Sequence, residues 1–132
     1  MLTVIDPSTG STIREVPLDE DAVIEEKLAR AASTYADWRR ASFAERAAVL
    51  RSVAAQLRAD VEELAPLMTE EMGKPIKEAR GEVQKAAWCA EHYAEHAGSY
   101  LASQEIASDA TRSWVQYLPL GTVLGVLPWN AP

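Results

Sequence analysis

The pattern of apolar and polar positions begins with two short runs that suit β-strands. Leu2–Ile5 and Thr12–Val16 are rich in β-branched residues, and Asp6–Gly10 (Asp-Pro-Ser-Thr-Gly) separates them. Proline presets the backbone for a turn and glycine accepts a positive φ, so this spacing predicts an antiparallel hairpin. A lone two-stranded hairpin is marginally stable in water, so we expect it to lean on another part of the protein.

Apolar residues then recur every three or four positions, which predicts a succession of helices. The four expected helices run from Asp19 or Glu20 to about Ala41, from Ser42 to near Asp60, from there to Gly73, and from Pro75 to about Ser103. Ser42 and Glu45 form a capping-box pattern, which marks a helix start. Pro66 would remove an interior hydrogen bond, so we expect a break near Asp60 rather than one long helix.

The apolar stripe of the last helix is made mostly of small residues. It comprises Ile76, Ala79, Val83, Ala86, Ala90, Ala94, Ala97 and Leu101. Small side chains allow a neighbouring helix to approach closely. Trp88 falls nearly opposite this stripe, which predicts a second packing partner on the back of the helix.

The C-terminal part changes to a strand-like pattern. Gln104–Thr111 is polar and is expected to be a loop, whereas Arg112–Leu118 is aromatic and β-branched and predicts a strand. Val123–Leu127 is a short apolar run typical of a strand buried on both faces of a parallel sheet. It ends at Pro128–Pro132, where an open α/β sheet places its ligands. A parallel strand needs neighbouring strands, which crossover connections supply. We therefore expect residues 1–132 to be the truncated N-terminal part of a larger protein.

Composition and charge narrow the classes of partner. The 132 residues carry a net charge of −7, which leaves no basic surplus for binding nucleic acid. No apolar run is long enough to span a bilayer, so we expect no membrane partner. The chain has one cysteine, which cannot form an internal disulfide, and this favours a reducing, cytoplasmic location.

Two features of the last helix resemble chemical sites without predicting one. His92-Tyr-Ala-Glu-His96 matches the H-x-x-E-H pattern of some zinc proteases, but such a site needs a third ligand and a cleft. We interpret these histidines as part of a solvated face and expect no metal. Cys89 lies in mid-helix with only Lys85 as a nearby cation, which does not suit a reactive thiol.

Asn130 is the stronger candidate for chemistry. An amide on a rigid turn after a buried strand can donate a hydrogen bond to a developing oxyanion. Asparagine and proline are also common turn residues. The spacing alone leaves both interpretations open.

Several motifs, in order along the chain, resemble the aldehyde dehydrogenase superfamily. Pro119–Pro132 fits P-x-G-x-x-x-x-x-x-P-W-N-x-P, and Asp6–Gly10 resembles the opening N-P-x-T-G hairpin with Asp in place of Asn. Trp38-Arg39 followed by Glu45-Arg46 resembles its W-R and E-R segment. Glu71–Ala79 fits E-x-G-K-P-x-x-E-A. Within the superfamily, the sequences E-M-G-K-P-I and L-P-W-N-A-P are most similar to those of the bacterial succinate-semialdehyde dehydrogenases.

The resemblance implies an α/β fold. Residues 1–132 would be the incomplete N-terminal part of the NAD(P)-binding domain: a hairpin, three to four helices, then strands entering a Rossmann-type cofactor domain. Residues 112–118 would be a bridging strand that helps a homo-oligomer, a dimer or tetramer, to assemble.

The resemblance also implies a function. Members of the family oxidise an aldehyde to the carboxylic acid with NAD or NADP, through a cysteine thiohemiacetal. The similarity to the succinate-semialdehyde dehydrogenases implies that the aldehyde here is succinate semialdehyde. Asn130 would be the catalytic oxyanion donor, and Leu127, Pro128, Trp129 and Asn130 would line the cofactor site.

The remaining catalytic groups of the family lie further along its sequence. No residue here matches the nucleophilic cysteine, the general-base glutamate or the glycine-bearing cofactor loop, and Cys89 is not at the nucleophile position. We therefore expect residues 1–132 alone to be inactive. The alternative prediction from the sequence is a non-enzymatic helical module for interaction or oligomerisation.

Overall fold

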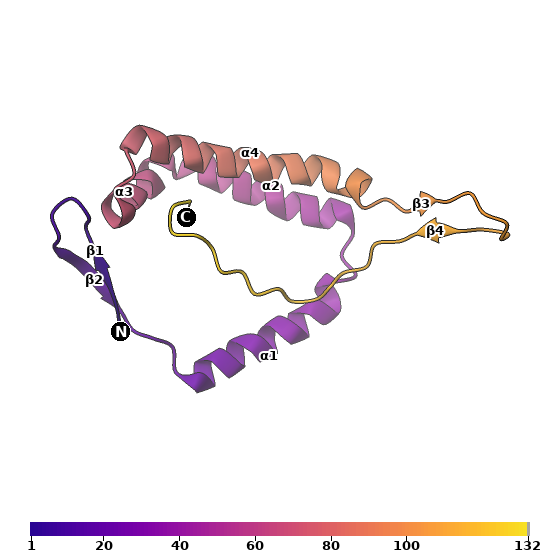
Figure 1. The fold of residues 1–132 in the computed structure, drawn as a ribbon, viewed down its shortest axis with the longest axis horizontal. Helices are drawn as coiled ribbons and strands as arrows, with labels where there is room; N and C mark the ends of the chain where they lie inside the picture. The colour runs from indigo at the N-terminus through magenta and orange to yellow at the C-terminus, as the bar shows by residue number, and fades with distance from the viewer. Residues whose placement is uncertain (132) are drawn as a thin grey trace.

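The computed structural model describes residues 1–131 and has the expected α/β character, with helices and small strand pairs (Figure 1). In chain order its elements are β1 (Leu2–Ile5), β2 (Thr12–Val16), α1 (Asp21–Trp38), α2 (Phe43–Ala59), α3 (Val61–Met72), α4 (Ile76–Tyr100), β3 (Gln104–Glu105) and β4 (Trp114–Val115). The strands form two separate antiparallel pairs, β1 with β2 and β3 with β4.

The predicted hairpin is confirmed. Leu2 pairs with Val16, and the register shifts at Ile5. The Asp6 carboxylate accepts hydrogen bonds from the backbone N–H of Ser8 at 2.7 Å and from its hydroxyl at 2.6 Å. These bonds favour the ionised acid and lower the pKa of Asp6. Gly10 has φ 75°, so it takes the left-handed conformation that the turn requires.

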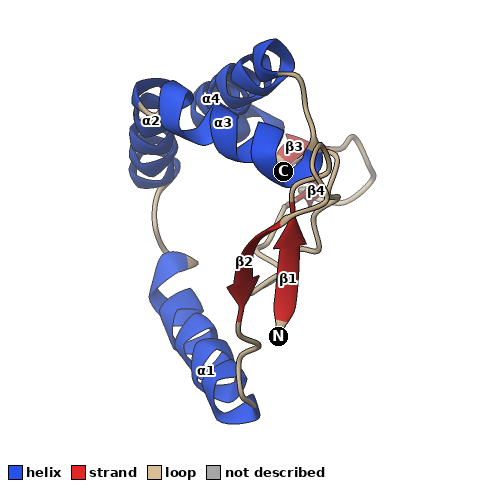
Figure 2. Cartoon of the chain, turned by 90° about the vertical axis from the view of Figure 1, so that its left-hand side faces the viewer, coloured by secondary structure: helices blue, strands red, loops and turns tan. Residues whose placement is uncertain are grey.

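The core lies where α2, α3 and α4 pack together (Figure 2). Its buried residues are all small or β-branched: Ala47, Ala54, Val61, Ala65, Ala79, Val83 and Ala87. Ser42 caps α2 as predicted, because its hydroxyl accepts from the Glu45 N–H and its own N–H donates to the Glu45 carboxylate. The break at Asp60 is also confirmed, since α2 ends at Ala59 and α3 begins at Val61.

The predicted stripe of α4 is only partly confirmed, and its two ends, Ile76 and Leu101, are exposed. Ala79 and Val83 are buried as expected, but Ala87 is buried and Ala86 is exposed. The spacing 79, 83, 87 follows one i, i+4 ridge of the helix, which is the ridge that meets α2 and α3. Trp88, as predicted, lies on the exposed back of α4.

The first helix, α1, does not join this core. It makes no substantial packing contact with another helix, and its apolar residues Ile24, Leu28 and Trp38 are exposed. Its last turn is instead held by Arg46, whose guanidinium donates to the carbonyls of Trp38 at 3.3 Å and Arg39 at 3.1 Å.

Residues 104–118, predicted as a polar loop followed by a strand, form two short paired strands instead. Gln104–Glu105, inside the predicted loop, pairs with Trp114–Val115, the only paired part of the predicted strand 112–118. α4 also ends at Tyr100 rather than near Ser103.

The prediction of a buried strand at Val123–Leu127 is wrong for the structure as described. The segment is extended but unpaired, and Leu124 and Val126 are 89% and 88% exposed. A parallel strand becomes a strand only when neighbours satisfy its backbone groups, and residues 1–131 supply none beside it. The chain from Pro119 to Ala131 instead runs from α1, where Tyr35 donates to the Pro119 carbonyl at 3.1 Å, back towards α4 (Figure 1).

No helix among the described residues is both long enough and apolar enough to cross a membrane.

Two ion pairs that join neighbouring helices are expected to make the stability of the fold depend on pH. Glu62 pairs with Arg80 and Glu91 with Arg58, and hydrogen bonds from these guanidinium groups lower the pKa of both acids below 4.5. A lowered folded-state pKa stabilises the fold above the unfolded pKa, and this contribution is lost as the pH falls through the folded value. We expect urea denaturation to show stability falling below pH 4.5, and less steeply in the double variant Glu62→Gln/Glu91→Gln. Glu70→Gln, which removes an acid with no described partner, should keep the wild-type slope.

Candidate functional site

The candidate site forms where the C-terminal segment returns to the junction of α3 and α4. The turn at Pro128–Ala131 is closed by the Ala131 N–H, which donates to the Pro128 carbonyl at 3.5 Å. The ammonium group of Lys74 donates to the backbone carbonyl of Asn130 at 3.1 Å. This contact connects two segments that lie 56 residues apart in the sequence.

An ion pair supports that contact. The Lys74 ammonium also binds the carboxylate of Glu82 on α4. The side chains are only 16% and 23% exposed, whereas every other described ion pair has partners that are at least 36% exposed. Reduced exposure weakens screening by water and salt, so this pair holds its geometry better than the surface pairs do.

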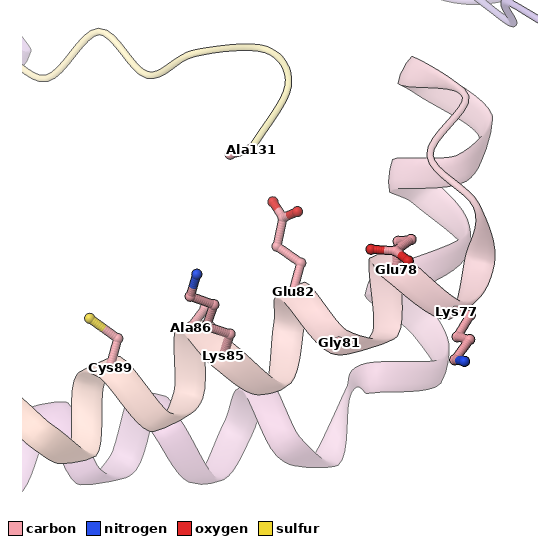
Figure 3. Close-up of a pocket in the computed structure, with 8 residues that line it drawn as sticks. All are labelled: Lys77, Glu78, Gly81, Glu82, Lys85, Ala86, Cys89 and Ala131. Atoms are coloured by element: carbon pink, nitrogen blue, oxygen red, sulfur yellow. The ribbon is translucent and has the colours of Figure 1, made fainter.

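Apolar surface lies beside the turn. Trp129 borders a groove between α3 and α4 whose other walls include Leu64, Met68 and Val83. On the neighbouring face of α4, Glu82 and Cys89 line a shallow pocket opposite Ala131 (Figure 3). Glu82 borders both hollows, so the carboxylate that binds Lys74 lies at the centre of the site.

The loop Gly73–Pro75 positions Lys74. Gly73 ends α3 in the left-handed conformation, with φ 76°. A Cβ on Gly73 would lie 3.1 Å from the Pro7 ring, so the hairpin turn packs directly on this loop. Arg14 of β2 also pairs with Glu71 in the last turn of α3. The hairpin therefore leans on the α3–α4 junction, as a marginal hairpin must.

The predicted site residues lie close together along the chain but differ in their contacts. Asn130 is held through its carbonyl, and Trp129 lies at the groove, although it is 78% exposed. Leu127 is 80% exposed and Pro128 is exposed as well. The catalytic and cofactor-binding roles of these four residues stay predictions. Pro132, the last residue of the motif, lies outside the described residues.

Lys74 and Glu82 were missed as site residues by the sequence analysis. Lys74 was recognised only as part of the E-x-G-K-P motif, and the glutamates of α4 resemble an ordinary solvated face. One feature of the sequence could have indicated Lys74. It lies between Gly73 and Pro75, which fix the backbone and therefore the point from which its long side chain starts.

The histidines of α4 contact aromatic neighbours. His92 Nε2 lies 2.9 Å from the Tyr100 hydroxyl, and the rings of His92 and His96 are 4.6 Å apart between centroids. Within residues 1–131 no cluster of three acidic, histidine or cysteine side chains could hold a metal ion. Cys89 is exposed.

Comparison with known proteins identifies the family. The model of the aldehyde dehydrogenase family matches residues 1–132. The chain belongs to the aldehyde dehydrogenase family. The resemblance inferred from the P-W-N and E-x-G-K-P motifs is thereby confirmed.

The relatives of this aldehyde dehydrogenase chain include enzymes named for one substrate. Succinate semialdehyde dehydrogenase Sad of Escherichia coli (strain K12), named for NAD(P)+, is 40% identical over 97% of this chain and 28% of its own length. A probable succinate-semialdehyde dehydrogenase of Synechocystis sp., named for NADP+, is 39% identical over 99% of the chain and 29% of its own length. The chain thus spans less than a third of the length of these relatives.

Solved structures agree with the fold. Succinic semialdehyde dehydrogenase from Streptococcus pyogenes, in complex with NADP+, aligns with a TM-score of 0.80 at 34% identity over 85% of this chain and 25% of that one. An indole-3-acetaldehyde dehydrogenase in apo form aligns with a TM-score of 0.86 at 28% identity over 99% of this chain and 31% of that one.

The contact between Gly73 and Pro7 predicts a matched pair of glycine substitutions. Gly73→Ala should destabilise the chain by about 1–3 kcal/mol, because the new Cβ meets the Pro7 ring and the positive φ is strained. Gly81→Ala, inside α4 with open space around it, should stabilise it by roughly 0.5–1 kcal/mol. Urea denaturation midpoints measure both effects, and equal shifts in the two variants would contradict the proposed docking of the hairpin.

Proposed function

We propose that residues 1–132 supply the oxyanion donor and one edge of the cofactor site of an NAD(P)-dependent aldehyde dehydrogenase. The whole protein would oxidise an aldehyde to the carboxylic acid. The observation that carries this proposal is the Pro128-Trp129-Asn130 turn, anchored at the α3–α4 junction of a chain that belongs to this family.

The role of Asn130 follows from the chemistry of the carbonyl group. Attack by a cysteine thiolate on an aldehyde turns the carbonyl oxygen into an oxyanion. A neutral amide N–H on a fixed turn stabilises that charge, and needs no particular pH to do so. Lys74 restrains the backbone of the same residue, so the donor would be positioned before the reaction begins.

The residues before Asn130 suit a planar cofactor ring. Leu127 and Trp129 present exposed apolar surface, and the extended backbone leaves its polar groups open to a ligand. Leu127, Pro128 and Trp129 would hold the nicotinamide end of NAD or NADP through apolar and backbone contacts. When bound, this cofactor accepts the hydride that the oxidation releases.

The relatives are named for succinate semialdehyde, and we propose that the whole protein oxidises this aldehyde. We propose that the protein works in the cytoplasm as a homo-oligomer, a dimer or tetramer. Residues 112–118, of which only Trp114–Val115 is paired here, would form its bridging strand.

The alternative, a helical interaction module without catalysis, draws support from one surface. α4 exposes the large side chains of Trp88, Tyr93 and Tyr100, and the His92 ring lies next to all three. Such a patch is typical of a surface that binds another protein.

The 132-residue chain alone should show no NAD(P)-dependent oxidation of succinate semialdehyde, because no residue in it matches the family's nucleophilic cysteine or general-base glutamate. NAD(P)H absorbance during incubation with the aldehyde is the measurement. Turnover that survives repeated purification would contradict this prediction, and loss of that turnover in Cys89→Ser would identify a different nucleophile.

In the whole protein that contains these residues, Asn130→Ala should lower kcat by about 10²–10³, the usual effect of removing one oxyanion donor. Steady-state kinetics measure it. Gln84→Ala removes an equivalent amide from an exposed position on α4 and should leave kcat unchanged. An unchanged kcat in Asn130→Ala would refute the proposed role.

A further inference from the structure

We propose that Lys74 is a positioning residue for Asn130, and that its ion pair with Glu82 fixes the turn that carries the oxyanion donor. This inference rests on the proposed function, because it assigns Lys74 a role through Asn130. Lys74 itself would touch neither substrate nor cofactor.

The hydrogen bonding of the C-terminal segment supports this role. Among the described residues, the bond from Lys74 to the Asn130 carbonyl is the only hydrogen bond that joins residues 123–131 to another part of the chain. The segment's two other polar anchors lie earlier, at Pro119 and Thr122, and both lead to α1. Without Lys74, therefore, apolar contact at Trp129 is what remains to hold the turn near the core.

The origin of the Lys74 side chain is fixed on both sides. Gly73 packs against the Pro7 ring, and Pro75 has φ −54°, the value to which its own ring restricts it. The far end of the side chain is fixed by Glu82, which projects from the rigid helix α4. A long flexible side chain held at both ends acts as a spacer of defined length.

The chemistry of the contact also suits a positioning role. An ammonium group has three donors and no acceptor, so it binds a carbonyl and a carboxylate at once and cannot accept from an amide N–H. Lys74 therefore holds the backbone of Asn130 while leaving the side-chain N–H groups free to donate to an oxyanion.

The kinetic test uses the whole enzyme. Lys74→Met keeps most of the side-chain volume but removes the ammonium, and kcat should fall by about 10–100-fold, as expected for a misplaced catalytic group. KM should change little, because the oxyanion contact forms in the transition state. Lys74→Arg, which can still bind both oxygens, should recover part of kcat. Lys27→Met, which breaks the exposed pair with Asp19, is the matched control and should leave kcat unchanged.

A double variant separates positioning from general stability. If Lys74 acts through Asn130, Lys74→Met/Asn130→Ala should lose no more kcat than Asn130→Ala alone. Independent losses that multiply, or an unchanged kcat in Lys74→Met, would overturn the inference while leaving the role of Asn130 intact. An unchanged kcat in Asn130→Ala would overturn the proposed function and this inference with it.

A second measurement keeps the test open if Lys74→Met weakens the whole enzyme. In the 132-residue chain, ¹⁵N relaxation should show Trp129–Ala131 becoming mobile on the ps–ns timescale in Lys74→Met, with α2 and α4 unchanged. Glu82→Gln, which keeps the acceptor but removes its charge, should give an intermediate effect. An equally ordered turn in wild type and Lys74→Met would contradict the inference.

Discussion

Small buried residues let the backbone of α4 lie close to α2 and α3. Ala47 and Ala54 on α2, Ala65 on α3, and Ala79 and Ala87 on α4 are buried without losing side-chain entropy. This contact fixes the axis of α4 relative to the rest of the core. The α3–α4 junction, Glu82 and the groove beside Trp129 all take their positions from that axis.

The loop between α3 and α4 carries this rigid geometry to the candidate site. Gly73 receives the hairpin turn at Pro7, and Lys74 binds the Asn130 carbonyl on the other side. The hairpin turn at Pro7 and the turn at Asn130, more than 100 residues apart in the sequence, are thus both held by two adjacent residues of one loop. The E-x-G-K-P motif accordingly has a mechanical explanation: its glycine accepts a close contact and its lysine reaches a distant backbone.

Two apolar elements, α1 and Val123–Leu127, remain outside the core because no other described element packs over them, but only α1 forms regular structure. α1 forms because its hydrogen bonds are internal to the helix, but Ile24 and Leu28 of its stripe are exposed and it makes no substantial contact with another helix. Val123–Leu127 cannot satisfy its backbone internally, so it stays extended and exposed. Local hydrogen bonding can complete a helix, whereas a strand requires a partner.

The sequence alone determined the features that rest on local chemistry. The Asp6–Gly10 turn, the Ser42–Glu45 cap and the break at Asp60 depend on neighbours within a few residues, and the P-W-N motif indicated the family. Tertiary structure decided that Ala87 rather than Ala86 is buried, that Gln104–Glu105 pairs with Trp114–Val115, and that Lys74 joins Glu82 to Asn130. Those outcomes depend on how whole helices meet and on contacts across as many as 56 residues, which no local pattern encodes.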